Sequence, residues 1–120
     1  MRLLAVLAFM LFAPVAALAE MRLVMVEQAG CAYCAAWDEA IGPIYPKTSE
    51  GAAAPLLKVD MHDLPADITF ARPPLFTPTF VLMQDGVEIG RIEGYPGEDF
   101  FWGLLNQMIE TAQPSEMVQG

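Results

Sequence analysis

The stretch that decides the fold runs from residue 22 to residue 41 and reads RLVMVEQAGCAYCAAWDEAI. Its first five residues form an apolar run with β-branched members, which predicts a strand over 22–26. From Cys34 onward, apolar residues recur in steps of three and four, which predicts the buried face of one helix. The members of this face are Cys34, Trp37, Ile41 and Ile44. The stretch is therefore predicted to be a strand that turns into a helix, with two cysteines at the turn.

Three more strands are predicted further along the chain. The apolar runs 56–60 and 79–83 each indicate a buried strand. Asp85-Gly86 is the strongest hairpin signal in the chain and leads into a fourth strand over 87–92. A strand–helix–strand unit joins parallel strands, and a hairpin joins antiparallel ones. The sequence thus predicts an α/β fold with a four-stranded mixed sheet flanked by helices.

The connecting segments give weaker signals. Residues 47–54 are small and polar and predict a loop, whereas residues 61–78 contain four prolines and leave room for one short helix near 64–70. Acidic residues at Glu98-Asp99 suit the positive start of a last helix. The buried stripe of that helix is predicted to comprise Phe101, Leu105, Met108 and Ala112, widened by Phe100 and Leu104.

The first nineteen residues have the pattern of an export signal. Met1-Arg2 is a short positive start, residues 3–15 are an apolar run, and Ala17-Leu18-Ala19 has small residues where a signal peptidase cuts. We expect residues 1–19 to be a cleaved signal peptide and residues 20–120 to form one domain outside the cytoplasm. A membrane anchor is the less favoured alternative, because a span needs about 20 apolar residues and Pro14 interrupts this run.

Composition excludes several classes of partner and site. Fifteen acidic residues against six Lys and Arg give a formal net charge of −9, which argues against nucleic acid or an anionic membrane surface as a partner. Two cysteines in 120 residues exclude a multi-disulfide framework and a four-cysteine zinc site. Outside the cytoplasm these two cysteines can form a disulfide. We expect a monomer.

Cys31 and Cys34 carry the predicted chemistry. Side chains three residues apart on a helix lie on one face, so the two sulfurs can approach bonding distance. The free N–H groups and the dipole at a helix start favour a negative sulfur, which makes Cys31 the attacking thiolate. Cys34 lies on the buried face of the helix. It is therefore predicted to resolve the mixed disulfide that Cys31 forms with a substrate.

The cysteine pair has three alternatives to redox chemistry. A static structural disulfide is disfavoured because so short a loop removes little unfolded-state entropy. Attachment of a c-type haem requires His after the second cysteine, and Ala35 stands there. A metal site would have to combine the two cysteines with His62, which falls short of four ligands. A copper carrier that uses Cys31, Cys34 and His62 stays open as the alternative function.

Over about residues 21–112, these motifs resemble the thioredoxin superfamily. The resemblance is carried by Cys31-Ala-Tyr-Cys34 after a strand, by Lys58-Val59-Asp60, by Thr77-Pro78-Thr79-Phe80 and by Asp85-Gly86 with Gly94. Within the superfamily, the chain is most similar to small periplasmic thiol–disulfide proteins, including those encoded with bacterial sulfur-oxidation systems. The resemblance implies a thioredoxin-like domain over 20–120 and a location in the periplasm.

The resemblance also implies roles for residues outside the cysteine pair. Thr77 would be followed by a cis peptide bond to Pro78 that faces the cysteines, and its backbone would pair with an extended substrate segment. Tyr33 would either contact partners or cover the disulfide.

A buried Asp of the family is replaced here by Met25. Strand alternation puts Glu27 on the same face as Met25, where it could relay protons to Cys34 with Lys58 as its ion partner. A solvated Glu27 at the loop edge is the interpretation that composition statistics favour.

We therefore predict a periplasmic thiol–disulfide oxidoreductase that exchanges disulfides with protein partners through its Cys-Ala-Tyr-Cys motif. Reduction of partner disulfides is the expected direction, with electrons resupplied by a membrane-embedded donor. No metal and no cofactor beyond the Cys31–Cys34 disulfide is expected. A copper-binding chaperone of thioredoxin fold is the alternative.

Overall fold

The computed structural model describes residues 20–113, so the predicted signal peptide lies outside the described residues. The described part contains β1 (Met21–Glu27), α1 (Ala32–Ala40), the 3-10 turn η1 (Tyr45–Lys47), α2 (Ser49–Ala53), β2 (Leu56–Asp60), β3 (Thr79–Gln84), β4 (Val87–Glu93) and α3 (Glu98–Ala112). Within this range, no helix is both long and apolar enough to cross a membrane.

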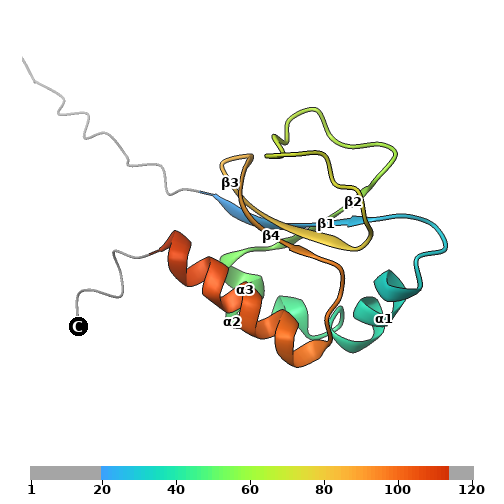
Figure 1. Cartoon of the computed structure of the whole chain (residues 1–120). Helices are drawn as coiled ribbons and strands as arrows, with labels where there is room; N and C mark the ends of the chain where they lie inside the picture. The colour runs from blue at the N-terminus through green and yellow to red at the C-terminus, as the bar shows by residue number, and fades with distance from the viewer. Residues whose placement is uncertain (1–19, 114–120) are drawn as a thin grey trace, which may run out of the picture.

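The four strands form one sheet in the order β2-β1-β3-β4 (Figure 1). β1 and β2 are parallel, with Leu23 opposite Leu56 and Glu27 opposite Asp60. β3 is antiparallel to both of its neighbours, β1 and β4. The predicted α/β fold with a four-stranded mixed sheet flanked by helices is confirmed.

The hairpin between β3 and β4 turns at the predicted position. Asp85 and Gly86 have φ angles of 52° and 80°, both in the left-handed region. A two-residue hairpin turn of this kind requires positive φ at both central positions, and Asp-Gly meets that requirement at low cost. This local signal thus sets the register of the two strands.

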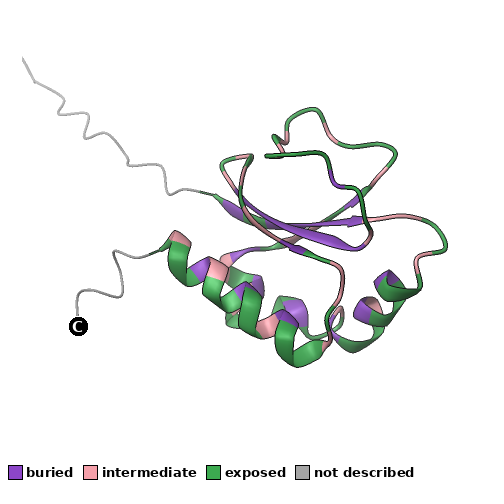
Figure 2. Ribbon diagram, in the orientation of Figure 1, coloured by how far each residue is buried: buried purple, intermediate pink, exposed green. Residues whose placement is uncertain are grey.

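One face of the sheet carries the main core and is covered by α1, α2 and α3 (Figure 1). Figure 2 shows the central strands β1 and β3 largely buried and the outer sides of these helices exposed. Trp37, Phe80 and Phe101 are fully buried there, with ring centroids 4.9–5.7 Å apart. The stripe predicted on α1 is right for Cys34, Trp37 and Ile41. It is wrong for Ile44, which is exposed because the helix has already ended at Ala40.

The opposite face is covered by the connection between β2 and β3, residues 61–78. The buried residues on this side are Val24, Val26, Val59, Val81 and Met83. The helix predicted near 64–70 is wrong. Thr69 instead pairs with Val87 like a short extra strand, its N–H donating to the Gly86 carbonyl at 2.8 Å. Backbone that is bonded to the edge of a sheet in this way is not free to close helical hydrogen bonds.

Residues 47–54 are also not the predicted loop, because they contain the end of η1 and α2. Thr48 caps α2 by accepting a hydrogen bond from the Gly51 N–H at 3.0 Å. Gly51 is buried so close to the carbonyl of Tyr45 that an added Cβ would overlap its oxygen. Gly51, one of the small residues that predicted a loop, is therefore required by tight packing against Tyr45.

α3 begins at Glu98 as predicted, but its buried stripe differs. Phe101 and Leu105 are buried, and Ile109 is the third buried member. Met108 and Ala112 are only partly buried at the margin of the core. The prediction that Phe100 and Leu104 widen the stripe is wrong, because both are exposed. One narrow face of α3 is enough to cover the sheet beside α1.

Candidate active site

Cys31 and Cys34 form a disulfide at the N-terminus of α1, with their Cα atoms 5.2 Å apart. Cys31 is the N-cap residue, and its Sγ accepts a hydrogen bond from the Cys34 amide at 3.2 Å. Cys31 is half-buried, whereas Cys34 is 4% exposed and belongs to the main core. Cys31 Sγ is thus both the more exposed sulfur and the one that accepts a hydrogen bond from an N–H at the start of the helix. In the reduced protein the same N–H favours the thiolate of Cys31.

A depression of about 490 Å³ lies next to the disulfide. Its wall consists of residues 27–32, which form the end of β1, the connecting loop and the start of α1, together with Cys34, Ala35, Asp38 and Asp60. Three of the lining residues carry carboxylates, Glu27, Asp38 and Asp60. Gly30 has a φ of 76° and open space where a side chain would stand, so the backbone beside Cys31 is accessible.

The predicted ion pair between Glu27 and Lys58 is present, at 3.8 Å between Oε2 and Nζ. The sequence did not reveal that Lys58 makes its shorter contact with Asp38, at 2.6 Å from Oδ1. All three side chains are between 33% and 40% exposed, so the group is largely solvated. Glu27 nevertheless lines the same depression as Cys34.

Thr77 and Pro78 are joined by a cis peptide bond. Thr77 is half-buried, and its Oγ1 accepts a hydrogen bond from Gln28 Nε2 at 2.8 Å. Gln28 belongs to the loop between β1 and α1, which we call the cysteine loop, and it lines the depression at the disulfide. Its contact with Thr77 therefore places Thr77 next to this loop. Among the described residues, neither the N–H nor the C=O of Thr77 makes a backbone hydrogen bond. Tyr33, between the two cysteines, is 67% exposed.

Gln28 and Asp38 are site residues that sequence reasoning missed. No local sequence pattern connects Gln28 with Thr77, 49 residues away. His62, the third ligand of the copper alternative, lies with its Nε2 3.3 Å from Gln28 Oε1. Within residues 20–113, no group of three His, Cys, Asp or Glu side chains is arranged to hold a metal ion.

Comparison with solved structures identifies the family. The periplasmic thioredoxin SoxS from Paracoccus pantotrophus, in its reduced form, is 58% identical to this chain with a TM-score of 0.76. The match covers 78% of this chain and 99% of that chain. The chain belongs to the thioredoxin family. The resemblance inferred from the cysteine, proline and hairpin motifs is thereby confirmed, and the association with sulfur-oxidation proteins is consistent with this relative.

More distant thioredoxins share the fold. That of Fasciola hepatica is 19% identical with a TM-score of 0.54, and the match covers 74% of this chain and 81% of that one. That of Malassezia sympodialis is 19% identical with a TM-score of 0.50, and the match covers 75% and 76%. Comparison with family models and with curated proteins finds no match.

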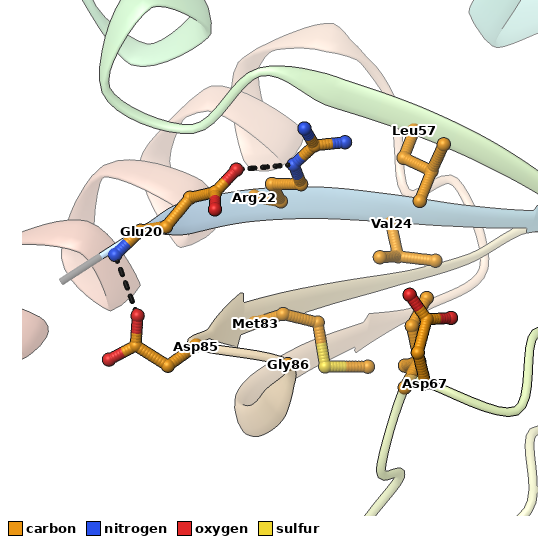
Figure 3. Close-up of a pocket in the computed structure, with 9 residues that line it drawn as sticks. Glu20, Arg22, Val24, Leu57, Asp67, Met83, Asp85 and Gly86 are labelled. Atoms are coloured by element: carbon orange, nitrogen blue, oxygen red, sulfur yellow. Dashed lines mark hydrogen bonds and ion pairs between the residues drawn. The ribbon is translucent and has the colours of Figure 1, made fainter.

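A second depression in this thioredoxin, of about 290 Å³, lies at the other end of β1 (Figure 3). Glu20 pairs with two other polar residues of its wall: the Glu20 N–H donates to Asp85 Oδ1 at 2.9 Å, and Arg22 Nε donates to Glu20 Oε1 at 3.0 Å. Val24, Leu57 and Met83 form its apolar wall. The depression has no cysteine and is separated from the disulfide by the length of the strand, so the candidate active site is the one at α1.

Proposed function

We propose that this thioredoxin is a periplasmic thiol–disulfide oxidoreductase that reduces disulfides in protein partners through Cys31 and Cys34. The observation that carries the proposal is the arrangement of the two sulfurs. Cys31 is accessible and receives the Cys34 amide hydrogen bond, while Cys34 lies beneath it in the core. The 58% identical periplasmic relative supports the location and the class of reaction.

The reaction proceeds in two exchanges. The Cys31 thiolate attacks one sulfur of the partner disulfide, the partner S–S bond breaks, and the departing partner sulfur takes up a proton. Cys34 then gives up its proton and attacks Cys31 Sγ, which releases the second partner sulfur and forms the Cys31–Cys34 disulfide. Two electrons pass from this protein to the partner. A membrane-embedded donor must restore them, because the periplasm has no thiol buffer.

The segment before Pro78 is the proposed docking place for the partner chain. Thr77 has a backbone N–H and C=O without backbone partners among the described residues, as strand addition by an extended peptide requires. Leu75 and Phe76 on this segment, and Tyr33 on the first turn of α1, are large exposed side chains. They supply the apolar contacts that such a peptide needs in addition to backbone hydrogen bonds.

Glu27 is the proposed acceptor of the Cys34 proton, with Lys58 as its ion partner. The support is that Glu27 and Cys34 line one depression and that Lys58 lies 3.8 Å from the Glu27 carboxylate.

Trapping of a mixed disulfide tests the proposed function. Cys34→Ser leaves the attacking cysteine without its resolving partner. This variant should therefore accumulate mixed disulfides with periplasmic proteins, and a reductant should cleave these complexes. Cys31→Ser is the matched control and should capture none, because the remaining cysteine is buried. Equal capture by both variants, or none by Cys34→Ser, would overturn the proposal. The wild-type protein should also accelerate the reduction of insulin by dithiothreitol.

A further inference from the structure

We infer that Gln28 is a positioning residue that holds the Thr77 segment ready for a substrate strand, and that His62 holds the Gln28 amide in place. This inference rests on the proposed function, because it assumes a partner chain that pairs at Thr77. It assigns a role to the two side chains near the disulfide that the exchange chemistry itself leaves unused.

Gln28 connects three loops that meet at one end of the sheet. It follows β1, while His62 follows β2 and Thr77 precedes β3. Its Nε2 lies 2.8 Å from Thr77 Oγ1, and its Oε1 lies 3.3 Å from His62 Nε2. These contacts span 49 and 34 residues of sequence. A single half-buried side chain therefore connects the cysteine loop with the proposed docking segment and with the end of β2.

The two ends of an amide differ, and both ends of Gln28 are used. Its NH₂ group donates to the Thr77 hydroxyl oxygen, and its carbonyl oxygen accepts from the His62 ring when Nε2 carries the hydrogen. The backbone of His62 is itself fixed, because its N–H donates to Asp60 Oδ1 at 2.7 Å. The His62 ring thus opposes rotation of the amide away from Thr77.

The bond from Gln28 matters because a Thr hydroxyl readily competes for nearby backbone groups. Free Thr side chains bond to neighbouring N–H and C=O groups in loops. The flanking backbone is already held, since Thr79 Oγ1 donates to the Phe76 carbonyl at 2.6 Å and the Gly94 N–H donates to the Pro78 carbonyl at 2.8 Å. Because Gln28 bonds to its hydroxyl oxygen, the Thr77 side chain is held in one orientation, and the Thr77 N–H and C=O stay available for the partner chain. Such pre-organisation lowers the ordering cost of binding.

The test compares two substrates that differ in their need for Thr77. A disulfide-containing peptide uses the docking segment, whereas 5,5′-dithiobis(2-nitrobenzoate) has no backbone with which to pair. The protein is reduced beforehand, so its own dithiol supplies the two electrons for one exchange. For Gln28→Leu we expect the second-order rate constant for the peptide, divided by that for the small disulfide, to fall roughly five- to tenfold, as expected for the loss of one hydrogen bond. A general structural role would affect both substrates alike. Gln107→Leu, at an exposed position on α3, is the control.

A double-mutant cycle isolates the contact. Thr77→Val alone should lower the same ratio, and Gln28→Leu added to it should change the ratio less than twofold. His62→Ala should lower the ratio roughly threefold, because its contact with Gln28 is longer.

The inference is overturned if Gln28→Leu leaves the ratio within twofold of wild type. It is also overturned if Gln28→Leu lowers the ratio as much in the Thr77→Val variant as it does in the wild type. The role of His62 is overturned if His62→Ala leaves the ratio unchanged. If the wild-type protein reduces neither substrate, the proposed function fails and the inference fails with it, which is a different outcome from the first two.

Discussion

Replacing Glu88 by Gln should destabilise the protein strongly, because it removes one half of a buried ion pair on β4. The Glu88 and Arg91 side chains are 5% and 6% exposed. Arg91 donates from Nε and Nη2 to the two carboxylate oxygens at 2.8 and 2.6 Å, and the Ala71 N–H donates to Glu88 Oε1 at 3.0 Å. Removing one partner of such a pair typically costs about 3–5 kcal/mol. We expect about 3 kcal/mol here, since the pair lies on an edge strand.

The effect of this substitution should depend on pH. Burial by itself raises the pKa of Glu88, but the hydrogen bonds from Arg91 and from the Ala71 N–H, and the charges of Arg91 and Arg72, lower it below the usual 4.5. A carboxyl whose pKa is lower in the folded state stabilises the fold fully above the unfolded-state value, and this stabilisation is lost as the pH falls through the folded-state value. The difference between wild type and Glu88→Gln should therefore be full at pH 7 and shrink below pH 4.5.

Urea unfolding of the oxidised protein, followed by the fluorescence of the buried Trp37, measures this difference. Glu93→Gln is the matched control on the same strand. Its carboxylate lies 2.6 Å from Arg72 Nη2 and 3.6 Å from Arg91 Nη1 but is 40% exposed, so its loss should cost at most about 1 kcal/mol. The reasoning is refuted if Glu88→Gln costs no more than Glu93→Gln at pH 7, or if its cost is undiminished at pH 3.

Three further predictions concern packing, proton transfer and export. Gly51→Ala should lower the free energy of unfolding by about 1–3 kcal/mol, because the added Cβ would overlap the Tyr45 carbonyl. Gly103→Ala on α3 adds a Cβ that meets no other atom and should raise the free energy of unfolding by about 0.5–1 kcal/mol. Urea unfolding measures both changes. Glu27→Gln should slow the decay of the mixed disulfide in stopped-flow experiments, and an unchanged rate would remove the proposed proton acceptor. Mass spectrometry of the exported protein should show Glu20 as its first residue; a mass that includes residues 1–19 would exclude cleavage.

Sequence signals sufficed where neighbouring residues decide the structure. The strands and the Asp85-Gly86 turn follow from local hydrophobic patterns and from backbone preference, and the mixed character of the sheet follows from connection rules. Sequence signals failed where contacts outside a segment's apolar pattern decide. α2 is capped by Thr48 and packs Gly51 against Tyr45, and residues 64–70 stay extended because Thr69 bonds to the β3–β4 hairpin. No apolar periodicity within either segment indicates these contacts.

In the candidate site, too, the sequence predicts the local contacts and not those between distant loops. Cys31 and Cys34 are three residues apart, so helix geometry alone predicts their proximity and their unequal burial. The contact of Glu27 with Lys58 follows from the parallel pairing of two predicted strands. The bond between Gln28 and Thr77 depends on the final positions of two loops, which sequence periodicity does not determine.

The hydrogen bonds of Thr69 to the hairpin also shield an edge of the sheet. Unpaired N–H and C=O groups on an outer strand attract other chains and invite aggregation. Here the Thr69 N–H donates to the Gly86 carbonyl at 2.8 Å, and the Thr69 carbonyl accepts from the Glu88 N–H at 3.0 Å. The beginning of β4 therefore presents fewer free N–H and C=O groups to a neighbouring molecule.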